Sequence, residues 1–329
     1  MSDTNALEGR VAIITGGARG IGLAISEMLA ARGASVIIAD NGCDIDGRDP
    51  DPSVAQEVAG KLGEQARAYT SDMSVPAAAR EAVDLAMEEF GGIDIVVNNA
   101  AILRDTLIFK PSVDDWDTVI RNNLSAAYYL IGAATPIMRE QSKAGRGTED
   151  GTEDGTENGT EGRKYTWGRI INLVSTAAFY GNYGQASYAS AKGGLTSLMR
   201  ITALDMMRSG ITCNAVAPFA HTRVTEMIEP ANDEQAAYKE RGLTVPATHV
   251  GNLVGYLCSP AAQDVSGQLF GVRGREVMLF SQPRPIANIV AVGDEWDSDT
   301  LARTVDMELR GDFAELVTDL EIFNTDPKI

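Results

Sequence analysis

Residues Val11–Gly22, VAIITGGARGIG, decide the fold that the sequence predicts. The first residues form an apolar, β-branched run typical of a buried strand, and a helical pattern begins within the glycine-rich stretch. Glycines in such a turn permit a tight bend and close approach of a pyrophosphate, and the helix N-terminus supplies free N–H groups. We predict a site for the phosphates of a dinucleotide; an ordinary glycine-rich loop is the alternative. The residues predicted to contribute are Gly16, Arg19, Gly20, Ile21 and Gly22.

Outward from this segment, the chain alternates apolar runs with helical patterns as far as Gly274. Continuous apolar strands separated by helices indicate a parallel sheet that is buried on both faces. Right-handed crossovers then give a Rossmann-type, doubly wound α/β fold of about seven strands with helices on both faces, in a single domain over 1–281. The expected strands are Val11–Thr15, Ser35–Ala39, Ala66–Thr70, Ile93–Val97, Arg169–Val174, Ile211–Val216 and Gln268–Val272. The clearest helical patterns are Ile21–Ala31, Val75–Phe90, Asp114–Met138 and Ala186–Arg208.

The charge balance argues against two classes of partner. The 329 residues include 28 Lys and Arg against 46 Asp and Glu, a net charge of −18, whereas binders of nucleic acids and anionic membranes need a basic surface. No apolar run approaches the ~20 residues of a membrane span, and Met1–Arg10 lacks the pattern of a secretory signal. The three cysteines are far apart and lack metal-ligand spacing. We therefore expect a cytoplasmic protein with no metal site that acts on a small molecule.

Two acidic segments stand apart from the predicted strands and helices. Residues 147–162 read GTEDGTEDGTENGTEG, with six acids and no base, so we expect a flexible, solvated insert over 143–166. The segment 282–329 holds eleven acids and four bases. Its apolar residues recur at helical intervals from Leu301 to Leu320, which predicts an amphipathic helical extension that Gly311 could divide in two. We expect this extension to dock on the main domain or on another subunit rather than to take part in catalysis.

Asp40 closes the second predicted strand, 18 residues after Gly22. An acid at this position can accept hydrogen bonds from the ribose hydroxyls of an adenosine, and its charge repels a 2′-phosphate. Arg19 favours the opposite choice, because a base in the turn can reach that phosphate. We give Asp40 more weight, since an unpaired carboxylate beside a phosphate is costly, and we predict NAD in preference to NADP. A plain turn residue is the alternative interpretation of Asp40.

Three further residues form a candidate catalytic group. Ser175 follows the strand Arg169–Val174, at the carboxyl edge where doubly wound sheets bind ligands. Tyr188 and Lys192 are four residues apart on a predicted helix and therefore share one face. A phenol with a pKa near ~10 is a poor base at neutral pH, and an adjacent ammonium stabilises its phenolate. We predict that Ser175 holds a substrate oxygen while Tyr188 takes or gives its proton.

Together, the pattern Thr-Gly-x-x-x-Gly-x-Gly from Thr15 and the pattern Tyr-x-x-x-Lys from Tyr188 resemble the short-chain dehydrogenase/reductase family, over residues 7–275. The resemblance implies hydride transfer with a nicotinamide cofactor, a homodimer or homotetramer, and Asn123 as a fourth catalytic residue whose backbone helps hold a proton-relaying water. Phe219 and Ala101 stand where the family has glycine. The cofactor contacts that the resemblance implies are Asp72, Met73, Asn99, Ala100, Tyr188, Lys192, Pro218 and Thr222.

Within the family, Ile102–Asp105, Asp115–Asp117 and Tyr180–Ala186 resemble the dehydrogenase part of peroxisomal multifunctional enzyme type 2. This resemblance implies NAD-dependent oxidation of a (3R)-hydroxyacyl-CoA, with a fatty-acyl or steroid side chain, to the 3-oxoacyl-CoA. We expect the segment 219–250 to form a lid over the substrate. The candidate substrate contacts are Gln185, Phe219 and His221. Three alternatives stay open: an NADPH-dependent 3-oxoacyl carrier-protein reductase, a hydroxysteroid dehydrogenase, and a nucleotide-sensing regulator that has kept the fold.

Overall fold

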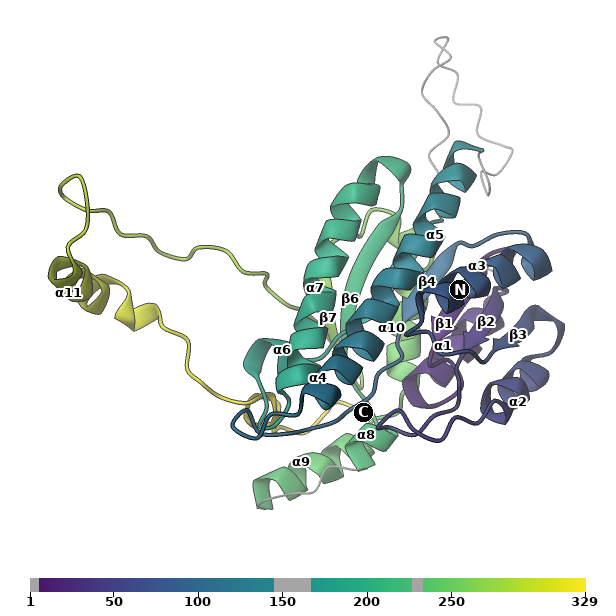
Figure 1. The fold of residues 1–329 in the computed structure, drawn as a ribbon, viewed down its shortest axis with the longest axis horizontal. Helices are drawn as coiled ribbons and strands as arrows, with labels where there is room; N and C mark the ends of the chain where they lie inside the picture. Colours follow the sequence, from purple (N-terminus) through teal and green to yellow (C-terminus); the bar gives the residue numbers. More distant parts are fainter. Residues whose placement is uncertain (1–5, 145–166, 227–232) are drawn as a thin grey trace, which may run out of the picture.

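The computed structural model describes residues 6–144, 167–226 and 233–329. Within these residues the strands form one eight-stranded sheet in the order β3-β2-β1-β4-β5-β6-β7-β8 (Figure 1). All neighbouring pairs are parallel except β7 and β8. The strands are β1 (Val11–Thr15), β2 (Ser35–Ala39), β3 (Ala66–Tyr69), β4 (Ile95–Asn98), β5 (Arg169–Leu173), β6 (Thr212–Phe219), β7 (Leu269–Arg273) and β8 (Glu276–Leu279). The strand order reverses between β1 and β4, which is where doubly wound sheets bind ligands.

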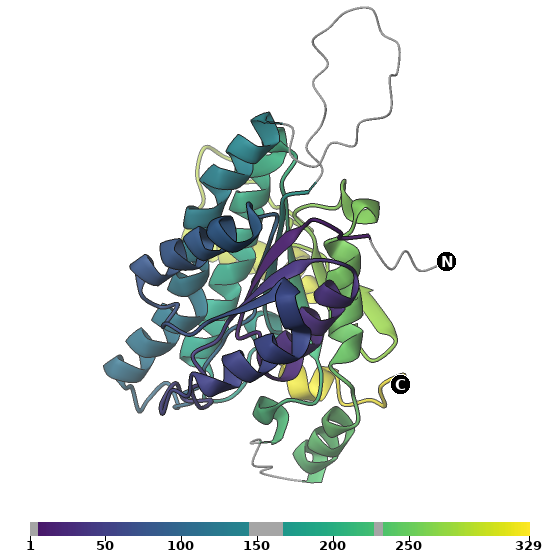
Figure 2. The ribbon, with the colours of Figure 1, turned by 90° about the vertical axis from the view of Figure 1, so that its right-hand side faces the viewer.

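Helices cover both faces of this sheet, as Figure 2 shows for α5 and α7 on one side and α1 and α10 on the other. Because successive side chains of a strand point to opposite faces, Val11 and Ile13 pack into one core and Ala12 and Ile14 into the other. The helices are α1 (Gly20–Ala31), α2 (Ser53–Leu62), α3 (Pro76–Phe90), α4 (Val113–Ile120), α5 (Ala126–Lys143), α6 (Ala177–Tyr180), α7 (Ala186–Met206), α8 (Arg223–Glu226), α9 (Asp233–Leu243), α10 (Thr248–Leu257), α11 (Ser298–Glu308) and α12 (Asp319–Ile322).

The predicted fold class is confirmed, with three differences in its elements. The strand β8 follows β7 through a turn at Gly274 and adds an antiparallel edge to the seven expected strands. The helix expected over Asp114–Met138 is two helices, α4 and α5, joined by a π-helical turn over Arg121–Ser125. The helix α2 was not among the predicted patterns; its residues Ala55, Val58 and Ala59 are buried against the sheet.

The acidic insert and the substrate lid that we expected both include residues that the structure does not describe. The acidic insert 143–166 lies outside the described residues beyond Ala144. The expected lid 219–250 contains the end of β6, helices α8 and α9 and the start of α10, and its residues 227–232 are also outside. None of the helices in the described ranges is both long and apolar enough to cross a membrane.

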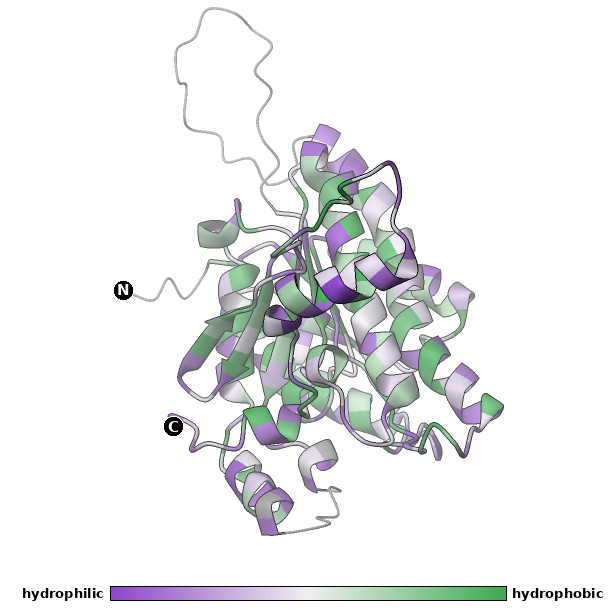
Figure 3. Ribbon diagram, turned by 90° about the vertical axis from the view of Figure 1, so that its left-hand side faces the viewer, coloured by the Kyte–Doolittle hydropathy of each residue, from purple (hydrophilic) through white to green (hydrophobic). Residues whose placement is uncertain are grey.

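The C-terminal extension leaves the body after β8 and returns to it at α12. Between them, α11 stands away from the sheet (Figure 1), and no residue of α11 is buried. Figure 3 shows hydrophobic residues gathered on the strands of the sheet, whereas α11 carries both hydrophobic and hydrophilic residues. The extension is therefore helical, as predicted, and it is divided near Gly311, as the sequence allowed: α11 ends at Glu308, and an extended stretch after a 3₁₀ turn at Arg310–Asp312 leads to α12.

Candidate active site

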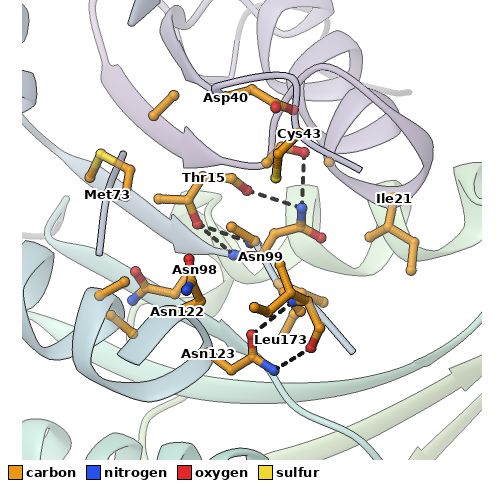
Figure 4. A pocket seen from close by; sticks show the side chains of 18 of the residues that line it. Thr15, Ile21, Asp40, Cys43, Met73, Asn98, Asn99, Asn122, Asn123 and Leu173 are labelled. Atoms are coloured by element: carbon orange, nitrogen blue, oxygen red, sulfur yellow. Dashed lines mark hydrogen bonds between the residues drawn. The ribbon is translucent and has the colours of Figure 1, made fainter. Parts of the chain in front are cut away.

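The glycine-rich turn after β1 has a shape that only glycine permits. Gly16 has a φ of +61°, in the left-handed region. A Cβ atom on Gly22 would lie 1.9 Å from the carbonyl oxygen of Gly16 and 2.6 Å from Nδ2 of Asn99. Asn99 itself donates from Nδ2 to the carbonyl oxygens of Thr15 (3.0 Å) and Gly16 (3.1 Å) (Figure 4). The first turn of α1 is therefore packed directly against the loop, with its N-terminus open toward a cavity.

Asp40 is held at the edge of this cavity by two backbone groups. Its Oδ2 accepts a hydrogen bond from the amide of Ala18 (3.1 Å), and its Oδ1 accepts one from the amide of Gly42 (2.8 Å). The guanidinium of Arg19 donates to the carbonyl oxygens of Gly42 (2.6 Å) and Cys43 (3.3 Å). Asp40 is thus held by the glycine turn and by the loop that follows β2, and Arg19 is held by that loop.

The cavity brings together every residue that the sequence predicted to bind cofactor. It has a volume of about 220 Å³ and extends from the loop after β2, past the glycine turn, to α7. Figure 4 shows Asp40 and Met73 on one side of it and Asn123 and Leu173 on the other. The lining includes Gly16, Arg19, Gly20, Ile21, Gly22, Asp40, Asp72, Met73, Asn99, Ala100, Tyr188, Lys192, Pro218 and Thr222.

Asn123 is buried in the π-helical turn between α4 and α5. Its Nδ2 donates to the carbonyl oxygen of Ile102 (2.8 Å), and its Oδ1 accepts from the amide of Ile102 (2.8 Å). The side chain thereby ties the helix to the segment after β4. Both amide atoms take part in this pair, which fixes the orientation of the side chain. No residue pattern in the sequence indicates the π turn itself.

Lys192 is almost fully buried beside Tyr188, one turn earlier on α7. Its Nζ donates to the carbonyl oxygen of Leu173 (2.7 Å) and lies 5.7 Å from the centre of the Tyr188 ring. Burial lowers the pKa of Lys192 to about 8. Burial also raises the pKa of Tyr188 to about 12, a hydrogen bond with Ser175 acts in the opposite direction, and the charges of Asp319 and Asp105 raise it further. In the protein alone, the phenol is therefore neutral over the physiological range, and the lysine does not by itself make it acidic.

A second cavity, of about 740 Å³, adjoins the first at Tyr188. Ser175, Gln185 and Phe219 line it, as the sequence predicted for the substrate side. Nε2 of Gln185 donates to Asp105 (3.1 Å), and burial raises the pKa of that carboxyl. His221 does not line either cavity; it is exposed and pairs with Glu226 at 2.7 Å. The prediction for His221 is therefore not supported by its position, because the backbone after β6 turns this side chain outward.

The second cavity also has a wall that sequence reasoning missed. Residues of the C-terminal extension line it beside residues of α9, although we expected the extension to have no part in the site. One signal was present: Thr318 and Glu321 have the spacing of a capping box, which they form at the start of α12. The missed lining residues are Tyr238, Arg241, Asp319, Leu320, Phe323, Thr325 and Pro327.

The chain is similar to enzymes that act on acyl thioesters. Residues 16–274 match a family model described as enoyl-(acyl carrier protein) reductase. Hydroxyacyl-CoA dehydrogenase ChsB1 of Mycobacterium tuberculosis is 34% identical, covering 92% of this chain and 90% of that protein. The 3-oxoacyl-[acyl-carrier-protein] reductase of Vibrio cholerae is 32% identical over 83% of this chain and 99% of its own length. Peroxisomal multifunctional enzyme type 2 of Mus musculus is 30% identical over 88% of this chain, which spans 36% of that protein.

Solved structures agree with these relatives. A short chain dehydrogenase from Mycobacterium avium superposes with a TM-score of 0.76 and 33% identity, covering 95% of this chain and 98% of the other. The 3-ketoacyl-(acyl-carrier-protein) reductase from Brucella melitensis, in complex with NADH, gives a TM-score of 0.67 and 25% identity over 82% of this chain and 98% of the other. The chain therefore belongs to the short-chain dehydrogenase/reductase family and is an oxidoreductase.

Proposed function

We propose that this chain oxidises a 3-hydroxyacyl-CoA to the 3-oxoacyl-CoA with NAD. The observation that carries the proposal is the position of Tyr188, which lies where the cavity lined by the glycine turn meets the larger cavity. A proton donor or acceptor at this junction can reach a secondary alcohol in the second cavity while a dinucleotide occupies the first. The larger volume of the second cavity, about 740 Å³, suits a bulky acyl group.

The residues of the first cavity fit a dinucleotide. The absence of a Cβ at Gly22 keeps the α1 N-terminus close to the loop, where N–H groups can hold a pyrophosphate, and Asp40 is placed for an adenosine ribose. When bound, the oxidised nicotinamide would supply the hydride acceptor. We propose that Ser175 donates a hydrogen bond to the substrate oxygen and that Tyr188 removes its proton. Tyr188 acts in this step as its phenolate and becomes the neutral phenol; the ammonium of Lys192, 5.7 Å from the ring centre, stabilises the phenolate before the transfer.

The direct test is turnover with defined thioesters. We expect the purified chain to reduce NAD in the presence of (3R)-hydroxyacyl-CoA substrates, with a higher kcat/KM for long or ring-bearing acyl groups than for hydroxybutyryl-CoA. A second candidate function is the reduction of 3-oxoacyl carrier-protein thioesters with NADPH. It is favoured by the relative from Vibrio cholerae, because the match with this chain covers 99% of that protein. A higher kcat/KM with NADPH and a carrier-protein thioester would select that function and reject ours.

The cofactor preference gives a prediction at Asp40. We expect Asp40→Asn to lower the ratio of kcat/KM for NAD to that for NADP by about tenfold or more, because the neutral amide no longer repels the 2′-phosphate. Dissociation constants of both cofactors, from fluorescence titration, check the same ratio without a substrate. Glu57→Gln, which removes an exposed carboxylate on α2, is the matched control and leaves the ratio unchanged. An unaltered ratio in Asp40→Asn would remove this residue from its assigned role.

The burial of Lys192 gives a prediction for stability. Its folded pKa of about 8 lies below the value of an exposed lysine, so the unfolded chain binds the proton more strongly. Folding therefore carries a penalty that is complete below pH ~8 and shrinks as the pH rises toward ~10.4. We expect Lys192→Met to increase the free energy of unfolding by about 2 kcal/mol at pH 7, after loss of the hydrogen bond to Leu173, and to lower turnover. Denaturant unfolding at pH 7 and pH 10 measures this; a Met variant that is less stable at pH 7 would contradict it.

A further inference from the structure

The returning end of the C-terminal extension is built into the body of the protein. We call residues 318–328 the closing segment. Arg273 of β7 donates from Nη1 to the carbonyl oxygens of Phe323 (2.9 Å) and Thr325 (3.1 Å), and Gly274 forms a β-bridge with Lys328. The ring of Phe323 packs against that of Phe219, with centroids 4.6 Å apart. These contacts fix the closing segment as one wall of the second cavity rather than as a loose tail.

Asp319 is the most buried charged group that the closing segment brings to this cavity. The residue is 7% exposed, and its Oδ2 accepts a hydrogen bond from the hydroxyl of Thr176 at 3.0 Å. Among the described residues, its Oδ1 has no hydrogen-bond partner. The amide of Asp319 donates to the carbonyl oxygen of Gly181 (3.2 Å), so both its backbone and its side chain are tied to the segment that follows β5. Burying a carboxyl with one unpaired oxygen costs free energy, and burial accordingly raises the pKa of Asp319.

The partner of Asp319 adjoins the candidate catalytic serine. Thr176 directly follows Ser175, whose Oγ accepts from the amide of Ala177 (3.2 Å) and whose hydroxyl is hydrogen-bonded to Tyr188. The tie between Asp319 and Thr176 therefore restrains the turn that aims Ser175 at Tyr188. It also places a carboxylate in the same cavity as the phenol.

The charged and polar groups around Tyr188 come from four parts of the chain. Asp319 of α12 and Asp105 of the segment after β4 raise the pKa of Tyr188, and the hydroxyl of Ser175 lowers it. Lys192 lies on the same helix, with Nζ 5.7 Å from the ring centre. Because Asp319 is itself largely buried, solvent screens its charge poorly.

We propose that Asp319 is a positioning residue of the active site, which holds the Ser175–Thr176 turn and supplies negative charge in the cavity that Tyr188 lines. The closing segment thereby sets how readily Tyr188 gives up its proton. The inference rests on the proposed role of Tyr188 as proton acceptor, and it adds a group from a segment outside the predicted domain.

The test is the pH profile of oxidation by Asp319→Asn. The amide keeps an acceptor for Thr176 but removes the charge, so the pKa of Tyr188 falls. We expect the acid limb of kcat/KM to move to lower pH by about half a unit to one unit, which raises the rate about threefold to tenfold at pH values below the limb. Asp319→Glu, which keeps the charge, returns the limb toward its original position. The exposed carboxylate of Asp312, in the same extension, supplies the control Asp312→Asn, with no shift.

A second measurement separates this inference from the proposed substrate. Tyrosinate absorbance, taken as the difference between each protein and its Tyr188→Phe counterpart, reports the ionisation of Tyr188 without any substrate. Thr176→Val removes the hydrogen bond and keeps the charge, so we expect the high-pH plateau of kcat/KM to fall about threefold or more with little movement of the limb. An unmoved limb and unmoved titration in Asp319→Asn overturn the proposal, as does an equal shift in Asp312→Asn. If Asp319→Asn does not fold, an unchanged plateau in Thr176→Val overturns it instead.

Discussion

Replacement of Tyr188 by phenylalanine is expected to lower kcat for alcohol oxidation by about a thousandfold or more, with a far smaller effect on the affinity for NAD. The side chain of Tyr188 lines both cavities, and the substitution removes only its phenol oxygen, the atom that exchanges a proton. General acid–base catalysis of this kind accounts for ~100- to 10,000-fold of rate. Lys192 and Ser175 remain but cannot replace it, because Nζ of Lys192 is turned to the carbonyl oxygen of Leu173. Initial rates and cofactor titration on the same preparation measure both quantities.

The control for this variant is another tyrosine of the same chain. Tyr128 on α5 is 61% exposed and lines neither cavity, so Tyr128→Phe keeps full activity. A Tyr188→Phe enzyme within tenfold of the original kcat would remove the phenol from the reaction. It would also favour the interpretation of the chain as a nucleotide-sensing regulator, since the fold would then have no need of this side chain.

Substitution of Gly22 by alanine is expected to abolish dinucleotide binding. The new Cβ would lie 1.9 Å from the carbonyl oxygen of Gly16 and 2.6 Å from Nδ2 of Asn99, distances that real atoms do not adopt. The start of α1 must therefore move away from the loop, and the N–H groups that face the pyrophosphate move with it. We expect the dissociation constant for NAD to rise by about a hundredfold or more, which corresponds to ~2.7 kcal/mol. Isothermal titration with NAD measures it.

Stability is the second measurement for this glycine. Backbone movement at a packed site costs free energy, so we expect Gly22→Ala to lower Tm as well. The control is Gly132→Ala in the middle of α5, where a Cβ would meet nothing within 4 Å and the backbone is helical. That variant is expected to raise Tm slightly, because alanine is the better helix former. A Gly22→Ala protein that binds NAD with unchanged affinity would contradict the close fit of the turn.

The parts of the fold that could be predicted are those with a strong local pattern. Strand β2 is a run of apolar residues buried on both faces, and its bounds Ser35–Ala39 are those expected from the sequence. Strand β8 was missed because it is a four-residue edge strand with no buried run: Glu276 and Met278 are half-buried, and Val277 and Leu279 are exposed. The π turn around Asn123 was also missed, since no residue type marks it; its register depends on the pairing of Asn123 with Ile102.

The candidate site likewise contains residues that a local sequence pattern predicts and residues that no local pattern predicts. Gly22 was identified from the spacing of glycines after the first strand. Tyr188 and Lys192 were identified because residues four apart on a helix share one face. Asp319 was missed because its partner, Thr176, is 143 residues away, and no local pattern encodes that contact. His221 was proposed from its place in the expected lid alone; in the structure it pairs with Glu226 and lines neither cavity.

The arm that carries α11 has a consequence for how the active site holds together. Residues 283–317 leave the body and return, and α11 has no buried residue, so this arm acts mainly as a tether for the closing segment. A tether of this kind keeps its end at an effective concentration of about millimolar, which makes docking an intramolecular event. One peptide-bond cleavage in the arm would turn the closing segment into a separate peptide ligand, held at the cavity by its own affinity and lost on dilution. The enzyme's activity would then depend on protein concentration, although no residue of its active site had changed.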